Sequence, residues 1–148
     1  IMTPYLILNQ EFNDALIFAA KRGVDVKIIV PSRPDKRTVF ALTRSYYRQL
    51  LQGGVQIWEY TPGFVHGKMF VSDDRTAVVG SINLDYRSLY LHFECAARFW
   101  DCPAVGEIER DIQATLTKCR RVTEEDCRRW PLLQRLTGWL LRPLAPLT

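Results

Sequence analysis

Residues 66–83, HGKMFVSDDRTAVVGSIN, form the most informative stretch of the chain for its fold and its functional site. Two apolar runs, MFV at 69–71 and AVV at 77–79, flank the polar stretch SDDR at 72–75, which is typical of a turn. This pattern predicts a β-hairpin. Because the two outer ends of a hairpin lie side by side, the residues before the first strand and after the second are expected to converge.

Polar residues occupy those outer ends with the spacing H-x-K-x4-D-x6-G-S-x-N, formed by His66, Lys68, Asp73, Gly80, Ser81 and Asn83. Residues two apart on a strand share a face, so the imidazole and the ammonium are expected to point the same way. Lysine supplies positive charge for a phosphate, serine and asparagine supply donors, and glycine lets backbone amides approach closely. A histidine beside them can attack phosphorus or shuttle a proton. An isolated His-x-Lys pair is usually a solvated strand, but six matched positions in eighteen residues favour a functional site.

This spacing resembles the HKD signature of the phospholipase D superfamily. Nearly the whole chain is similar to the C-terminal half of bacterial cardiolipin synthases, in the stretches TPYLIL, AAKRGVDVKIIVP, RSYYRQLLQGGVQIWEY, PGFVHGK and GSINLDYRS. The resemblance implies an α/β fold, namely a phospholipase D-like mixed β-sheet flanked by helices in an α-β-α sandwich.

The resemblance also implies roles for the residues of the motif. In this family a complete site takes two HKD motifs: one histidine forms a phosphohistidine, and the other protonates the leaving alcohol and then activates the acceptor. The C-terminal histidine more often has the acid/base role, so His66 is expected to be the general acid/base, with the nucleophile role left open. Lys68, Ser81 and Asn83 would hold phosphoryl oxygens. Asp73 belongs to the catalytic motif, although its place beside the turn favours bracing the hairpin.

Two further residues are expected at the rim of this site. Arg87 follows the motif in a polar, turn-like stretch, where it could hold a second phosphate or an internal carboxylate. Glu94 falls on a predicted strand at 91–100; a carboxylate bonded to one ring nitrogen would fix the tautomer of a catalytic histidine. The family's N-x-E pattern maps onto His92 and Glu94, and it implies this role for Glu94, while His92 departs from the pattern.

The rest of the chain alternates strand-like and helix-like segments. Strands are predicted at 2–8, 24–30, 55–60 and 91–100, and helices at 11–22, 38–52 and 103–119. Successive strand–helix–strand units favour a largely parallel sheet with helices on its faces. We divide the chain into a catalytic half at 1–120, carrying one HKD motif, and a tail at 121–148.

The tail is basic and amphipathic. Residues 128–148 hold four arginines and no acid, so the remaining residues balance at 16 basic and 16 acidic side chains. Within PLLQRLTGWLLR at 131–142, the apolar residues fall at helical spacing: Leu132, Leu133, Leu136, Trp139 and Leu140. Such a helix suits an anionic membrane surface, but the same stripe could cover the domain's own core or a missing half.

The composition bears on metal binding, on membrane-spanning segments and on the extent of the chain. Four cysteines without a C-x-x-C pair and two distant histidines give no metal-ligand pattern, so no metal and no cofactor are predicted. No apolar run reaches the roughly 20 residues that span a bilayer. Ile1 is not a translation start, so we expect the chain to be a piece of a longer protein whose upstream segments lie outside it.

The resulting prediction is a cardiolipin synthase-type phosphatidyltransferase at the cell membrane. It would move a phosphatidyl group between phosphatidylglycerol molecules, with the missing N-terminal HKD half or a second copy of the chain as partner. Alone, the chain is expected to be inactive. A homodimeric phosphodiesterase or nuclease and a non-catalytic lipid-binding half are the alternatives. A nuclease should be basic across its catalytic body, which is neutral here, so nucleic acid is not an expected partner.

Overall fold

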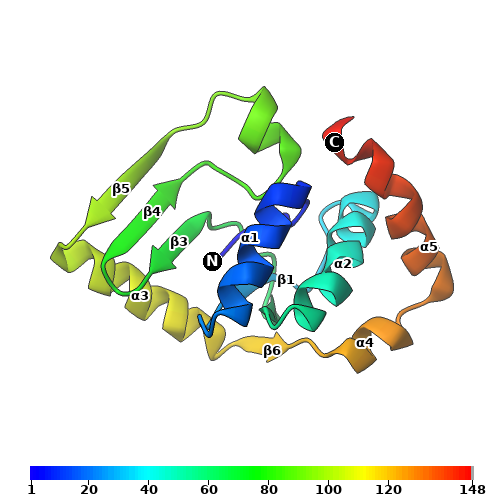
Figure 1. Ribbon diagram of the computed structural model, residues 1–148, viewed down its shortest axis with the longest axis horizontal. Coiled ribbons are helices and arrows are strands. Elements are labelled where there is room, and N and C mark those ends of the chain that lie inside the picture. Colours follow the sequence, from blue (N-terminus) through cyan, green and yellow to red (C-terminus); the bar gives the residue numbers. More distant parts are fainter. Residues whose placement is uncertain (148) are drawn as a thin grey trace.

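The computed structural model describes residues 1–147, except for the side chain of Leu147. In chain order the elements are α1 (Gln10–Lys21), β1 (Lys27–Pro31), α2 (Arg37–Gln52), β2 (Gln56–Tyr60), β3 (Met69–Ser72), β4 (Thr76–Gly80), η1 (Arg87–Leu91), β5 (Ala96–Trp100), α3 (Pro103–Leu116), β6 (Cys119–Arg121), α4 (Glu124–Arg129), α5 (Leu132–Leu141) and η2 (Arg142–Leu147) (Figure 1).

Two three-stranded parts, β1-β2-β6 and β3-β4-β5, are joined by the N-terminal segment. Met2 bridges Ile29 of β1 in parallel and Met69 of β3 in antiparallel orientation. Only β1 and β2 are paired in parallel; the other named strands pair antiparallel. The sheet is therefore mixed. The strand predicted at 2–8 is reduced to isolated bridges at Met2 and Leu6, since Pro4 has no amide hydrogen and the chain bends there.

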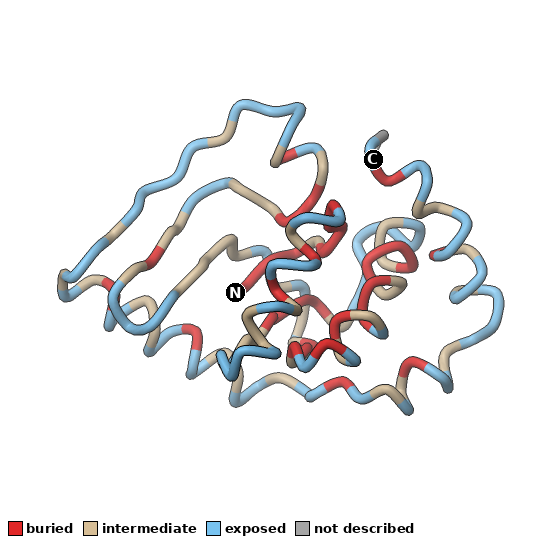
Figure 2. The backbone as a smooth tube through the Cα atoms, viewed as in Figure 1, coloured by how far each residue is buried: buried red, intermediate tan, exposed pale blue. Residues whose placement is uncertain are grey.

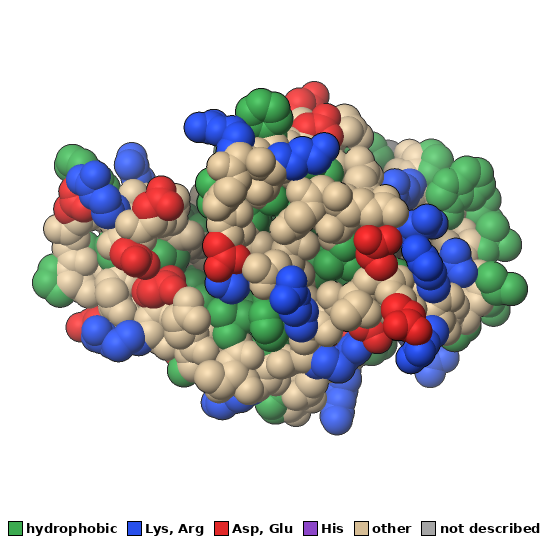
Figure 3. Space-filling model, turned by 60° about the horizontal axis from the view of Figure 1, so that its bottom comes forward, with side chains coloured by type: hydrophobic (Ala, Val, Ile, Leu, Met, Phe, Trp, Pro, Cys, Tyr) green, Lys and Arg blue, Asp and Glu red, His purple; other side chains and the backbone are tan. Residues whose placement is uncertain are grey.

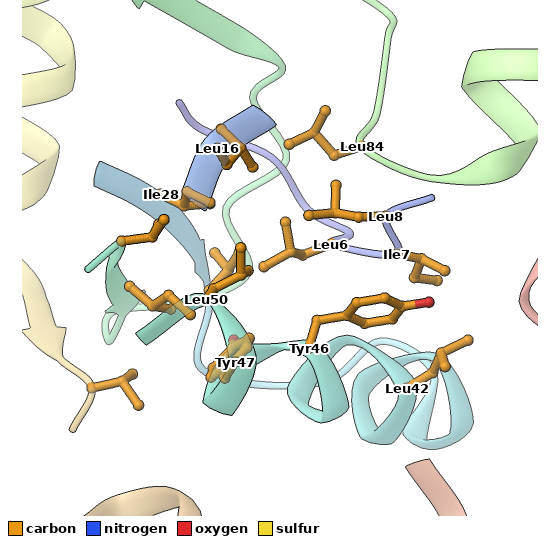
Figure 4. Close-up of a cluster of buried hydrophobic side chains, with 14 of the residues drawn as sticks. Leu6, Ile7, Leu8, Leu16, Ile28, Leu42, Tyr46, Tyr47, Leu50 and Leu84 are labelled. Atoms are coloured by element: carbon orange, nitrogen blue, oxygen red, sulfur yellow. The ribbon is translucent and has the colours of Figure 1, made fainter. Parts of the chain in front are cut away.

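Helices cover both faces of the β1–β2 part. Successive residues of a strand point to opposite faces, and Ile28 joins the main core under α2, whereas Ile29 joins a smaller cluster with Ile112 of α3. Figure 4 shows Tyr47 and Leu50 of α2 pointing toward the strand side of the main core. In Figure 2 the buried stretches gather along the N-terminal segment and α2, while β5 is mostly exposed. The α-β-α sandwich predicted from the sequence is confirmed.

Two predicted boundaries are wrong, and one helix was not predicted. The strand predicted at 91–100 begins only at Ala96, because the π-helix η1 and an unpaired stretch occupy the residues before it. The helix predicted to end at 119 stops at Leu116, and Cys119–Arg121 pairs with β2 instead. Helix α4 was not predicted, although its capping box, formed by Thr123 and Asp126, is a readable start signal.

The expected tail is packed on the body of the molecule. Its predicted helix is confirmed as α5, which lies beside α2 (Figure 1). The proposed division at residue 120 falls inside β6, and Val122, Cys127 and Ala145 belong to the main core. The division into residues 1–120 and 121–148 stays a prediction.

Candidate active site

The hairpin predicted from residues 66–83 is present and brings its outer ends together. β3 and β4 pair from Met69–Val79 to Ser72–Thr76. The Gly80 amide donates to the Lys68 carbonyl over 3.2 Å, which continues the pairing past the named strands. The segments carrying the histidine and the serine therefore lie next to each other.

His66 and Lys68 are in direct contact. They precede β3 in an irregular segment rather than lying on the predicted strand. The Lys68 Nζ lies 2.9 Å from Nδ1 and 3.1 Å from Nε2 of His66, and it donates to the His66 carbonyl over 2.9 Å. The imidazole is exposed, and its ring centre is 5.7 Å from that of Phe64. An exposed imidazole against an ammonium is suited to meet an approaching phosphodiester.

Ser81 and Glu94 form a hydrogen-bonded pair between the end of β4 and the start of β5. The Ser81 hydroxyl donates to the Glu94 carboxylate and accepts from the Cys95 amide over 3.0 Å. Hydrogen bonds from Ser81 and Ser88, with nearby His92 and Lys68, hold the pKa of Glu94 below its ordinary value. The expected bond between Glu94 and His66 is absent among the described residues, and Ser81 takes its place.

Two effects act in opposite directions on the pKa of the Lys68 ammonium. Burial lowers the pKa of the Lys68 ammonium, while the charges of Glu94 and Asp85 act to raise it. Asp85 is 7% exposed and accepts from the Ser88 amide over 2.7 Å. A cation against an imidazole, with carboxylate charges nearby, is suited to a phosphoryl oxygen.

A cavity of about 240 Å³ is lined in part by Tyr5, Lys36, Asn83, Arg87, His92 and Glu94, whereas His66, Lys68 and Ser81 do not line it. The Asn83 amide oxygen is buried and accepts no hydrogen bond from the described residues. Because a buried polar atom without a partner is costly, the Asn83 amide oxygen retains the capacity to accept a hydrogen bond from a donor group of a ligand.

Arg87 pairs with no carboxylate among the described residues. Its Nε–H donates to Nε2 of His92. The turn from Arg87 to His92 closes through a backbone bond of 2.9 Å. The residue that departs from the family pattern thus orients the rim arginine.

Two residues of the motif serve structure rather than the site. Asp73 lies in the hairpin turn with a φ of 53°, at the opposite end of β3 from His66, so the inclusion of Asp73 among the catalytic residues is not supported by the geometry. A Cβ on Gly80 would lie 2.3 Å from the Cys95 carbonyl oxygen. Glycine is needed there for the close approach of β5, rather than to open amides to a phosphate.

Sequence reasoning missed several residues around the cavity. Asp85 and Ser88 form a side-chain-to-backbone turn of a kind that Asp three residues before Ser can signal. Tyr5 donates to Asp35, and burial together with that carboxylate raises the pKa of Tyr5 to about 12. No local pattern links Tyr5 to the motif, because they meet only in the folded chain.

The part of the chain that the structure describes holds no group of three or more His, Cys, Asp or Glu side chains placed to bind a metal ion. Nor does it hold a helix both long and apolar enough to cross a bilayer.

Solved structures place this fold in a known class. It superimposes on phosphatidylserine synthase of Haemophilus influenzae with a TM-score of 0.75, at 18% identity, covering 97% of this chain and 39% of that one. It superimposes on Nuc of Salmonella typhimurium, a phospholipase D family member, with a TM-score of 0.68 at 24% identity, covering 82% and 78%. The chain therefore has a phospholipase D-like fold.

Sequence comparison identifies the family. A family model described as "Cardiolipin synthase, PLD-like domain" matches residues 1–116. Over 147 residues the chain is 52% identical to an uncharacterised protein of Streptococcus mutans and 37% identical to cardiolipin synthase 2 of Bacillus cereus. The chain belongs to the cardiolipin synthase, phospholipase D-like domain family. Matches cover 99% of this chain but 32% and 29% of those two relatives, so it spans about a third of their length.

Proposed function

We propose that this chain is the C-terminal half of a cardiolipin synthase-type phosphatidyltransferase and supplies one of two HKD motifs. The observation that carries the proposal is the contact between the Lys68 ammonium and the ring nitrogens of His66, at the end of the hairpin where the chain continues from Gly80 into Ser81. The family match and the short span relative to curated relatives support it.

The proposed reaction has two steps. In the first, a histidine of the second motif attacks the phosphorus of phosphatidylglycerol; the phosphorus–oxygen bond to the glycerol headgroup breaks, and protonated His66 gives its proton to that oxygen. In the second, neutral His66 takes the proton from a hydroxyl of another phosphatidylglycerol, which attacks the phosphohistidine and frees the histidine. The products are cardiolipin and glycerol. Lys68, Ser81 and Asn83 would hold the phosphoryl oxygens as charge develops.

The second motif would come from a segment outside this chain or from a second copy. A lipid substrate requires the site to reach a bilayer, so we place the working enzyme at the cell membrane. The alternative is a homodimeric phosphodiesterase. The homodimer is supported by the superposition on Nuc of Salmonella typhimurium, which covers 78% of that protein. A chain of similar size can therefore carry this fold.

The test incubates the chain with radiolabelled phosphatidylglycerol in micelles, alone and mixed with the N-terminal segment of the longer protein, and separates the lipids by chromatography. We expect labelled cardiolipin only in the mixture, and its loss with His66→Ala. Lys118→Ala, at an exposed position between α3 and β6, is the control for handling and folding. Phosphodiester hydrolysis by the chain alone would instead identify the homodimeric phosphodiesterase, and the absence of any turnover in both samples would contradict an enzymatic role.

A further inference from the structure

A second basic cavity lies between α2 and α5. It measures about 300 Å³ and is lined by five arginines, Arg44, Arg48, Arg128, Arg135 and Arg142. Neither helix carries a carboxylate along its length. None of these arginines lines the cavity beside Asn83, so this groove is separate from the candidate active site.

Two of the arginines build the groove. Arg44 donates to the buried Glu59 over 2.8 Å and lies 4.4 Å from the ring centre of Trp130. Arg142 donates to the hydroxyl and the carbonyl of Ser45 over 3.1 and 2.6 Å. These bonds tie both side chains to the protein, so they fix the shape of the groove rather than offering free charge.

Of the other three arginines, Arg48 and Arg135 pair with no carboxylate in the described chain. Among the described residues, Arg48 forms no hydrogen bond or ion pair, and Arg135 donates only to the Arg128 carbonyl, over 3.4 Å. Arg128 is 3.9 Å from Glu124, at the outer limit of an ion pair. All three arginines are exposed. The groove therefore presents uncompensated positive charge, which favours an anionic ligand.

An exposed apolar stripe runs beside the groove. Gly138 faces α2, where an added Cβ would lie 2.3 Å from the Ala41 carbonyl oxygen. The opposite side of α5 and the start of η2 carry exposed side chains, namely Leu132, Leu133, Leu136, Trp139, Leu140 and Leu144. Leu132 is 77% and Trp139 66% exposed, so the stripe does not cover the chain's own core. At the right of Figure 3, hydrophobic side chains gather at the edge of the molecule beside Lys and Arg side chains. Trp139 belongs to both surfaces, since it also lines the groove.

We propose that the α2–α5 groove binds the phosphate of an anionic phospholipid while the α5 stripe inserts among the lipids of the same bilayer. A cationic groove directly beside an apolar helix face matches an anionic bilayer, in which charged headgroups lie next to hydrocarbon. A symmetric contact with a second copy would bring the same arginines of both copies together without carboxylates from either helix. The proposal concerns binding and does not depend on the chemistry at His66.

The experiment measures flotation of the full chain with vesicles. Phosphatidylcholine vesicles are compared with vesicles that also contain phosphatidylglycerol, at low and high salt. We expect binding only to the anionic vesicles, weakening with salt, and a blue shift of tryptophan fluorescence that Trp139→Phe reduces. His66→Ala should bind as well as the unaltered chain, so loss of catalysis and loss of binding are distinguishable.

The variant that tests the groove is Arg48→Gln with Arg135→Gln. Both side chains are exposed and neither pairs with a carboxylate, so the fold should be retained. Each arginine near an anionic surface contributes about fivefold to affinity, so binding should weaken about 25-fold. Arg22→Gln with Arg110→Gln removes the same charge from exposed positions on or beside α1 and α3 and should change binding much less. Leu136→Gln, on the stripe alone, should also weaken binding.

Several outcomes would overturn the proposal. Equal losses in the two arginine pairs would mean that only net charge attracts the bilayer. Equal binding to phosphatidylcholine vesicles would leave no role for the net negative charge of the lipid. Saturation by soluble glycerophosphoglycerol without vesicle binding would assign the groove to a free phosphate ester. A dimer in sedimentation that Leu136→Gln dissociates would assign the stripe to a second copy.

Discussion

At the scale of single residues, the candidate site depends on Lys68. Its ammonium touches both ring nitrogens of His66, and the charges of Glu94 and Asp85 act to raise its pKa. Arginine is not equivalent here, because its planar guanidinium is larger and presents its donors in a rigid fork. This explains why a compact, rotatable ammonium suits the position.

We expect Lys68→Met to lower turnover by about 100- to 1000-fold in any assembly of this chain that processes a phosphodiester, since one charged donor to the developing phosphoryl charge is lost. The measurement is kcat on phosphatidylglycerol micelles. Lys118→Met, an exposed lysine after α3, should leave kcat unchanged. A similar kcat in both variants would remove Lys68 from the proposed chemistry.

Glu94 gives the site an acid-sensitive contribution to stability. Its pKa lies below the ordinary value of 4.5 in the folded chain, so its contribution is present above about pH 4.5 and is lost as pH falls through the lowered pKa. The unaltered chain should therefore lose its advantage over Glu94→Gln on acidification. Urea unfolding from about pH 6 to about pH 3 measures this difference.

The control for the acid effect is Glu107→Gln. Glu107 is exposed on α3 and forms no hydrogen bond or ion pair with the described residues. The substitution removes no contact of the described chain, so its effect on the free energy of unfolding should be smaller than that of Glu94→Gln. A Glu94→Gln difference that stays constant or grows on acidification would contradict the favourable contacts assigned to the Glu94 carboxylate.

At the scale of elements, two helical glycines differ in the space around them: Gly138 is crowded by backbone and Gly106 is open. An added Cβ on Gly138 of α5 would lie 2.3 Å from the backbone oxygen of Ala41, whereas one on Gly106 of α3 would meet only the end of the Arg110 side chain at 3.9 Å. Gly138→Ala should destabilise the chain by about 1–3 kcal/mol through overpacking. Gly106→Ala should stabilise it by about 0.5–1 kcal/mol through helix propensity. Thermal unfolding measures both, and a shift of the same sign in both variants would contradict the close approach of α5 to α2.

The ion pairs of Glu59 join β2 to α2 and β6. The carboxylate is 2% exposed and accepts from Arg44 over 2.8 Å and from Arg120 over 3.1 Å. Arg44→Met leaves a buried charge only partly compensated and should lower the free energy of unfolding by about 3 kcal/mol. Arg48→Met, one turn further along α2 and without a bonded partner in the described chain, should change it by less than about 0.5 kcal/mol. Urea unfolding at neutral pH measures both, and equal losses would show that helix α2 itself, rather than the ion pair, is sensitive.

At the scale of the whole molecule, the tail and the body share one core. Val122 and Cys127 are buried in the main cluster, and β6 crosses the proposed division at residue 120. A chain ending at residue 120 should therefore lose cooperative thermal unfolding, while one ending at residue 130 should unfold cooperatively at a lowered temperature. Cooperative unfolding of the shorter chain near the midpoint of the full chain would establish the tail as a separable unit.

The sequence by itself determined the fold class, the hairpin and the main helices. These follow from local information: apolar period, turn residues and caps depend on near neighbours in the chain. The spacing from His66 to Asn83 likewise predicted that the two ends of the hairpin would meet, because hairpin geometry fixes which residues converge.

Only the tertiary structure decided which side chains touch across the site and which face of α5 stays exposed. Glu94 bonds Ser81 rather than His66, and Arg87 bonds His92, because η1 sets how the chain approaches β5. The sequence of α5 alone was equally compatible with an apolar stripe that covers the core and one that is exposed. Gly138 settles the orientation, since the face without a side chain allows the closest approach to α2 and turns the leucines outward. Such contacts depend on the packing of elements distant in sequence, which no local pattern encodes.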